Sequence, residues 1–515
     1  MKRWIYQHRV GLLLALILAT AAFMRLYQLD SLPPGLHPDE AANGLDIFKI
    51  LEEKDFQPFY ERNGGRESLF FFLQSIGVSI FGNTIFALRI APALIGVASV
   101  LAVYLWTASW FRRRTALIAA LLMAVTPWGV IISRDGFRAG MVALMIPLTL
   151  WLFTKAFQTR QNLYFVLAGI SFGAGFYTYI AYRMFPLALL AMGLFVLIWR
   201  RKWLAIWWKK LAIAAIATVV VLLPLGWYAV ENPDAIAGRP GGVSVFNPDL
   251  NKGDLIGTLT DTTVKTALMF NIHGDENYRH NMGGEPQFNI FVGIMFILGI
   301  FVAITRIKRL QYFGLLMVFG AMLLPAVLTA EGIPHALRSI GALAPGLVLA
   351  AIGTNFLLAR WQAVFPLNSV ARTSGTAAIV LLLGLSVYHG YATYFSAWAS
   401  APETHKAYSE ENVALANYYN ENAPQGKRYV VAGAYTLQTI EYLTHNKSSY
   451  SQIDPPQVDA IPLEPGQEKE FAVFSYEKEK LLSRLQLKFP NGKVSPYYSS
   501  YSGDELFIIY RVPAQ

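Results

Sequence analysis

Residues 86–114 read FALRIAPALIGVASVLAVYLWTASWFRRR, an apolar run that ends in three consecutive arginines. A helix of about 20 mostly apolar residues is long enough to cross the roughly 30 Å hydrocarbon core of a bilayer. Lys and Arg in short loops are retained on the cytoplasmic side, so this segment is expected to enter from outside and to end inside at Arg112. The stretch therefore predicts a membrane protein and orients one of its spans.

The composition of the whole chain agrees with this interpretation. Of 515 residues, 54% are hydrophobic and 15% are charged, and the apolar residues lie in longer runs than a soluble domain has. The formal net charge of +10 comes from Lys and Arg clusters between apolar runs, which is typical of cytoplasmic loops and not of a nucleic-acid-binding surface. The sequence has no cysteine, which excludes disulfides, thiolate metal sites and cysteine nucleophiles.

Alternating basic clusters predict about eleven transmembrane helices, with the N-terminus in the cytoplasm and the C-terminus outside the plasma membrane. The first helix, about residues 10–29, is interpreted as an uncleaved anchor, although Ala19-Thr-Ala21 resembles a signal-peptide cleavage site. The apolar run of residues 68–81 is only about 14 residues long and is expected to be interfacial or re-entrant. Had it spanned, the triple arginine would face outward.

The predicted domains differ in the length of their apolar runs. Residues 1–396 are expected to form the membrane domain, with long outer loops at 30–85 and 231–289. From residue 397 to residue 515 the runs shorten to strand length, at 429–432, 470–474 and 505–510, and alternate with helical patterns at 410–420, 437–443 and 477–487. We therefore predict a polytopic α-helical membrane protein with a small extracytoplasmic α/β domain at its C-terminus.

His37-Pro38-Asp39-Glu40 begins the first candidate site, in the first outer loop. A charged group near hydrocarbon costs roughly 2.5 to 3.5 kcal/mol, so charges at outer helix ends are functional candidates. Of two adjacent carboxylates, one can accept the proton of an attacking hydroxyl while the other orients a partner or a metal. Asp39 and Glu40 are therefore catalytic candidates, and Asp39 is also a candidate metal ligand. The alternative is that Asp39 caps a helix over residues 40–51.

The second candidate site follows the third predicted helix and contains Arg134, Asp135 and Arg138. An aspartate between two arginines either forms an ion pair at the membrane interface or holds a phosphate clamp or a metal. On the second interpretation Asp135 is a catalytic and metal-binding candidate, and Arg138 binds the donor phosphate.

The third candidate site is the pair His335 and Arg338, three residues apart and on one face if the segment is helical. Two cationic donors at the outer end of a span suit a lipid-linked phosphate. Weaker candidates are Arg66, Glu67 and Arg183. The spacing of His273, Asp275, Glu276 and His280 matches no metal site, so a solvated loop is the favoured interpretation for these residues.

The order of these features resembles the GT-C superfamily of membrane glycosyltransferases, particularly protein O-mannosyltransferases and lipid A aminoarabinose transferases. The resemblance covers nearly the whole chain and rests on Asp39-Glu40, the apolar segment 69–81, Ala87-Leu-Arg-Ile-Ala-Pro-Ala-Leu94 and Asp135. It implies that Asp39 is the catalytic carboxylate and that Asp135 is the acid of the second loop. Gly65-Arg-Glu-Ser-Leu69 stands where many relatives have a Glu-Lys-Pro-Pro-Leu-like stretch.

The reaction that this resemblance implies is an inverting transfer of a hexosyl or pentosyl group from a polyprenyl-phosphate donor to a protein, lipid or glycan acceptor. Asp39 would act as general base, cationic groups would bind the departing phosphate, and a divalent ion, Mg²⁺ or Mn²⁺, would share that role. The rival interpretation is a multi-span transporter or lipid flippase. Against it, charged residues concentrate in the outer loops and not at the midplane of interrupted helices.

Overall fold

The computed structural model describes residues 2–234, 241–461 and 466–514, and their contacts form two compact units. The first unit contains the described residues within 1–27, 56–70 and 90–398. The second contains the described residues within 28–55, 71–89 and 399–515. Two segments of the first predicted outer loop thus belong to the same unit as the C-terminal residues.

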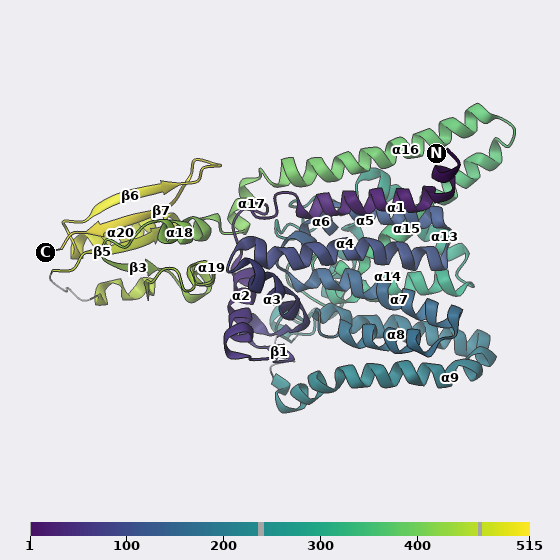
Figure 1. The fold of residues 1–515 in the computed structure, drawn as a ribbon, viewed down its shortest axis with the longest axis horizontal. Helices are drawn as coiled ribbons and strands as arrows, with labels where there is room; N and C mark the ends of the chain where they lie inside the picture. Colours follow the sequence, from purple (N-terminus) through teal and green to yellow (C-terminus); the bar gives the residue numbers. More distant parts are fainter. Residues whose placement is uncertain (1, 235–240, 462–465, 515) are drawn as a thin grey trace. The chain divides into compact units, whose positions relative to one another are not determined.

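The first unit is a bundle of apolar helices (Figure 1). Small residues bring the helices close: a Cβ at Gly299 would collide with the backbone carbonyl of Leu349, and one at Gly353 with that of Met295. Such small residues let helices pack in a membrane, where no hydrophobic effect drives them together. The helices are α1 (Lys2–Leu26), α4 (Ile85–Trp110), α5 (Arg113–Val125), α6 (Pro127–Arg134), α7 (Val142–Thr159), α8 (Asn162–Gly175), α9 (Phe185–Glu231), α11 (Pro248–Asn251), α12 (Leu255–Leu268), α13 (Ile290–Thr305), α14 (Leu310–Val327), α15 (Leu343–Val364) and α16 (Ser369–Ala392).

Among the described residues, seven helices are long and apolar enough to cross a membrane, or eight if the bent pair α5 and α6 is one span. The long helix α9 is broken at Arg200, where φ is −146° and ψ is 37°, and it covers two predicted spans. Helices α8 and α13 match predicted spans but are shorter. The predicted polytopic helical fold is confirmed, whereas the count of about eleven spans stays a prediction.

The third predicted span is not one straight helix. Helices α5 and α6 meet at an angle of 55°, and Thr126 between them is extended, with φ −61° and ψ 124°. The cause is local: the ring of Pro127 disfavours helical backbone in the residue before it. The bend precedes Arg134 and Asp135, so it sets the direction in which the chain enters the second candidate site.

The second unit contains a five-stranded sheet of order β4-β3-β5-β7-β6 (Figure 1). β3 is parallel to β4 and β5, whereas β7 is antiparallel to β5 and β6. The predicted strands 429–432, 470–474 and 505–510 are confirmed. β4 and β6 were not predicted, because β4 has only three residues and β6 is largely exposed. The strands are β3 (Lys427–Val431), β4 (Ser451–Ile453), β5 (Lys469–Phe474), β6 (Lys493–Tyr498) and β7 (Glu505–Val512).

Helices of the second unit come from both ends of the chain. α18 (Glu410–Glu421), α19 (Ala434–Thr444) and α20 (Lys478–Lys488) belong to the C-terminal domain, and each agrees with a predicted helix. α2 (Pro38–Phe48) and the predicted short apolar helix, α3 (Leu69–Phe81), come from the first predicted outer loop. A Cβ at Gly44 of α2 would collide with the Tyr442 ring of α19, so glycine allows these two helices to pack closely.

Candidate functional site

The N-terminus of α2 carries the first candidate site. His37 is the N-cap: its backbone is extended (φ −64°, ψ 143°) and its Nδ1 accepts the Asp39 N–H at 3.1 Å. The alternative that Asp39 caps the helix is therefore wrong. Pro38 occupies the first helical position, where its fixed φ is favourable, and holds the preceding residue extended, so the cap falls two residues earlier.

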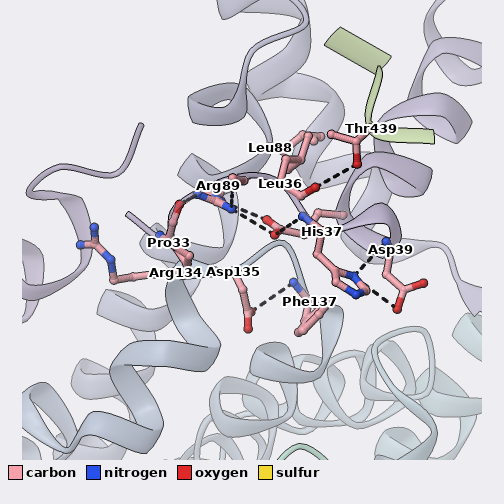
Figure 2. Close-up of polar contacts among 12 residues, drawn as sticks. Pro33, Leu36, His37, Asp39, Leu88, Arg89, Arg134, Asp135, Phe137 and Thr439 are labelled. Carbon is pink, nitrogen blue, oxygen red and sulfur yellow. Dashed lines mark hydrogen bonds and ion pairs between the residues drawn. The ribbon is translucent and has the colours of Figure 1, made fainter. Parts of the chain in front are cut away.

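Glu40 is a buried structural anchor. Its Oε2 lies 3.0 Å from Nε of Arg89, its Oε1 accepts from a second Arg89 nitrogen at 3.1 Å, and both side chains are fully excluded from solvent. Arg89 also donates to the carbonyl oxygens of Pro33 at 2.7 Å and Gly35 at 2.8 Å (Figure 2). Glu40 therefore holds the arginine that positions the loop before α2. Sequence reasoning missed Arg89, although a lone charge within an apolar run was a usable signal.

Asp39 differs from its neighbour in exposure. Its side chain is 34% exposed, and its Oδ2 lies 3.7 Å from Nδ1 of His37. The cap and the Glu40 ion pair orient the first turn of α2, which leaves the Asp39 carboxylate at the surface of the second unit. The two adjacent carboxylates therefore differ in burial, and their division of labour stays a prediction.

Arg134 and Asp135, in the first unit, are both fully buried. Arg134 donates to the Tyr394 hydroxyl at 2.7 Å and to the carbonyl oxygens of Met24 and Tyr27 at 3.0 and 2.7 Å. It thereby ties α6 to the end of α1 and to the segment after α16, and these contacts do not suit a phosphate clamp. Asp135 accepts the Phe137 N–H at 3.3 Å (Figure 2), which fixes the turn after α6.

Asp275, His280 and His335 form a cluster in the first unit, in which Asp275 and His280 are buried and His335 is partly buried. Their candidate ligand atoms all lie within 4.8 Å of one another. Oδ2 of Asp275 is 3.1 Å from Nδ1 of His280 and 3.8 Å from Nδ1 of His335, and it accepts the Ala336 N–H at 2.7 Å. The rings of His280 and His335 stack at 4.9 Å, and the Phe137 ring lies 6.2 Å from that of His280. The cluster therefore adjoins the Asp135 turn.

This cluster corrects two expectations. Asp275 and His280 are each only 3% exposed, so the solvated-loop interpretation is wrong for them, whereas His273 and Glu276 are exposed and pair with each other. His335 directly precedes a turn and is not on a helix, so it does not share a helical face with Arg338. Local spacing gave no signal because His335, the third residue of the cluster, is far from Asp275 and His280 in sequence.

One carboxylate and two imidazoles are a donor set that a divalent ion accepts. Burial lowers the pKa of His280, partly offset by Asp275, and thus favours the neutral imidazole that binds metals. Imidazole nitrogen favours zinc and similar ions over the expected Mg²⁺ or Mn²⁺. The hydrogen bonds of Asp275 to His280 and to the Ala336 N–H also allow the cluster to join the segment around Asp275 to the segment around His335 without an ion.

A separate cationic cluster surrounds Glu67 in the first unit. Nε of Arg138 lies 2.9 Å from Glu67 Oε2, and a nitrogen of Arg183 lies 3.5 Å from Oε1. Glu67 is 2% exposed, whereas Arg138 and Arg183 are 16% and 28% exposed. Two guanidinium groups share one carboxylate, so these three side chains carry a net positive charge at a partly open surface.

The two remaining candidates have other partners. Arg338 pairs with Glu331 at 3.3 Å, and its charge also acts on His280 of the Asp275 cluster. Arg66 is 2% exposed, and its Nε donates to the Arg62 carbonyl oxygen at 3.0 Å. The structure thus brings two of the weaker candidates, Glu67 and Arg183, together with Arg138.

Comparison with known proteins gives matches of three kinds. Residues 68–227 match the family described as "Dolichyl-phosphate-mannose-protein mannosyltransferase". "Putative mannosyltransferase YkcB" of Bacillus subtilis is 25% identical over 241 residues, which are 45% of this chain and 32% of the relative. The chain thus matches about a third of the length of this curated relative.

Two solved structures share the fold over nearly the whole chain. The oligosaccharyltransferase AglB of Archaeoglobus fulgidus, in complex with an inhibitory peptide and a dolichol-phosphate, has a TM-score of 0.54 and 17% identity, and covers 98% of this chain and 74% of its own. ArnT of Cupriavidus metallidurans, bound to undecaprenyl phosphate, has a TM-score of 0.54 and 14% identity, and covers 97% of this chain and 99% of its own.

Proposed function

We propose that this chain is a glycosyltransferase of the GT-C superfamily that moves a sugar from a polyprenyl phosphate to an acceptor hydroxyl at the outer face of the plasma membrane. The family match and the carriers bound by the two structural relatives support this proposal. The positive-inside pattern supports the outer location, with the N-terminus in the cytoplasm and the C-terminal domain outside.

The observation that carries the mechanism is the difference in burial between Asp39 and Glu40. Glu40 is committed to Arg89, whereas the Asp39 carboxylate is 34% exposed. Asp39 takes the proton of the acceptor hydroxyl while that oxygen bonds to the anomeric carbon. The bond from this carbon to the carrier phosphate breaks, its electron pair leaves with the phosphate, and the configuration inverts. A positioned base of this kind contributes roughly 10² to 10⁴ in rate.

The departing phosphate needs cationic partners, because charge develops on it as the bond breaks. Arg138 and Arg183 are our candidates: they are partly open, and Glu67 orients their guanidinium groups. Arginine binds phosphate oxygens through two parallel N–H groups, which fixes orientation as well as charge. His335 and Arg338 are weaker candidates for this role, since each is engaged elsewhere.

A divalent ion is a further component of the proposal. Asp275, His280 and His335 would hold it, and a bound ion would supply positive charge next to the Asp135 turn. Asp39 and Asp135 were the metal ligands predicted from sequence. They belong to different units, and their role in metal binding remains a proposal.

The test uses the purified full-length protein in detergent with a panel of radiolabelled polyprenyl-phosphate sugars. We expect at least one donor to release free polyprenyl phosphate, and Asp39→Asn to lower the rate of this release by about 10² to 10⁴. Asp30→Asn, at an exposed acid in the same unit, is the matched control and should behave as wild type. Release without a sealed compartment also separates a transferase from a transporter or flippase, which changes only the distribution of its substrate.

Two outcomes would contradict the proposal. Wild-type protein that releases polyprenyl phosphate from no donor would favour transport. Release that Asp39→Asn leaves unchanged would favour a transferase with a different base.

A further inference from the structure

In the second unit, the Asp39 turn lies at the same end as the start of α19. The ring of Tyr435, in the first turn of α19, lies 6.3 Å from that of His37. Thr439 donates to the Leu36 carbonyl oxygen at 2.9 Å (Figure 2), and near the other ends of the two helices Tyr442 stacks on Phe48 at 5.4 Å. Helices α2 and α19 therefore run in the same direction, with their N-termini together.

The start of α19 is also the carboxyl edge of the parallel strands. From β3 the chain passes through α19 to β4 on one side of β3, and later to β5 on the other side. Open α/β sheets bind ligands at such a reversal of strand order, beyond the carboxyl ends of the strands. A Cβ at Gly433, between β3 and α19, would have no other heavy atom within 4 Å. The backbone is thus open at this point.

Two exposed tyrosines flank this edge. Tyr435, after β3, is 49% exposed, and Tyr476, after β5, is 63% exposed. The ring of Tyr476 is held parallel to the fully buried ring of Phe474, with centroids 5.5 Å apart and planes at 3°. A rigid aromatic face exposed on a folded domain suits a partner with an apolar face and polar edges.

The charges near Tyr476 restrict the chemistry of that partner. Glu411 and Glu477 both act on Tyr476 electrostatically, and the neighbouring cation Lys478 is paired with Glu505 at 2.7 Å. Carboxylates accept hydrogen bonds from hydroxyl groups but repel phosphate. A neutral glycan fits this surface, because a sugar ring presents C–H groups on one face and hydroxyls at its rim. A lipid-phosphate headgroup does not.

We propose that the edge formed by Gly433, Tyr435 and Tyr476, the acceptor edge, binds a neutral glycan as the acceptor. This inference rests on the proposed function and names its acceptor class. The contact between Tyr435 and His37 places the acceptor edge beside the turn that carries Asp39. A sugar on the edge therefore presents a hydroxyl to the proposed base.

The test measures binding of neutral trisaccharides, namely mannotriose, maltotriose and chitotriose, to the full-length protein in detergent by saturation-transfer NMR. At least one should bind saturably, and Tyr435→Ala with Tyr476→Ala should weaken this binding about tenfold, since the two rings supply the apolar face of the site. Tyr435→Phe keeps the ring and should bind as wild type. Tyr498→Ala, at an exposed tyrosine of the edge strand β6, is the control and should also bind as wild type.

The same samples are assayed for release of polyprenyl phosphate from the donor panel and for binding of a Ser/Thr-containing peptide. Glycan binding without release would contradict the proposed function and leave the acceptor edge supported. Release by a protein that binds no glycan, or whose double variant binds as wild type, would overturn the acceptor edge alone. Peptide binding that the double variant loses, with no glycan bound, would also overturn it, because the occupant would be a polypeptide.

Discussion

Glu40 and Arg89 form a fully buried ion pair, with the Arg89 Nε 3.0 Å from the Glu40 Oε2. The same guanidinium binds the carbonyl oxygens of Pro33 and Gly35. One residue at the start of α4 thus holds both the loop before α2 and the first turn of α2, where Asp39 lies. The ion pair lets the loop present one carboxylate while its neighbour stays buried.

Arg89→Ala is expected to destabilise the protein strongly, because it leaves the Glu40 carboxylate buried without its main partner. Removing one member of a buried pair costs about 3 to 5 kcal/mol. Thermal unfolding in detergent should show a clear loss of stability for Arg89→Ala. The loss should be smaller for Arg89→Lys, which keeps the positive charge but lacks the paired N–H donors of the guanidinium group. Equal thermal stability of wild type and Arg89→Ala would contradict the anchoring role.

Asp39→Asn is expected to lower turnover by about 10² to 10⁴ while leaving thermal stability near that of wild type. The side chain is 34% exposed, and the cap comes from His37. Steady-state release of polyprenyl phosphate and a parallel unfolding curve check both parts. A large loss of stability would show that Asp39 supports the helix after all.

Arg138→Ala is expected to raise the KM for the donor by about 10- to 100-fold, because a hydrogen bond to a charged group contributes about 1.5–3 kcal/mol. Arg138→Lys should recover part of this affinity, since it restores charge without the paired N–H groups. Arg372→Ala, an exposed arginine of the first unit, is the control. A donor KM that does not change in Arg138→Ala would remove the Glu67 cluster from the donor site.

The cluster of Asp275, His280 and His335 is expected to hold about one zinc-like ion per chain. Metal analysis of the purified protein should find it in wild type, and His280→Ala and His335→Ala should lose it. His273→Ala is the matched control, because His273 is exposed and pairs with Glu276. Wild-type protein that retains no metal after incubation with zinc would make the cluster a hydrogen-bonded tie between loops.

Acidification is expected to weaken the same cluster. Burial lowers the pKa of His280 from its ordinary value of 6.5, so the neutral ring is favoured in the folded state. The contribution of His280 to stability is therefore complete above pH 6.5 and is lost as the pH falls through the lowered pKa. Unfolding curves between pH 4 and 8 should show this loss in wild type and less of it in His280→Ala.

The sequence predicted the elements of the fold better than it predicted the site. Strands β3, β5 and β7 follow from short runs of alternating or apolar character, and α18, α19 and α20 from helical periodicity. β6 was missed because Pro496 and its exposed side chains give no strand pattern. Asp39 and Arg138 were named as site candidates from local charge, and Glu67 and Arg183 as weaker ones. The pairing of Glu67 with both arginines was not predicted, since Glu67 and Arg183 lie far from Arg138 in sequence.

The sequence by itself determined that this chain forms apolar helices with a small α/β domain. In hydrocarbon each backbone polar group must be satisfied within its own helix, so a local apolar run is sufficient to specify one. Only the tertiary structure decided which of two adjacent carboxylates is buried, because Arg89 comes from another helix. It also decided that Asp275 and His280 meet His335. Tertiary packing brings such groups together, and the spacing of residues within a short segment does not predict which distant residues will meet.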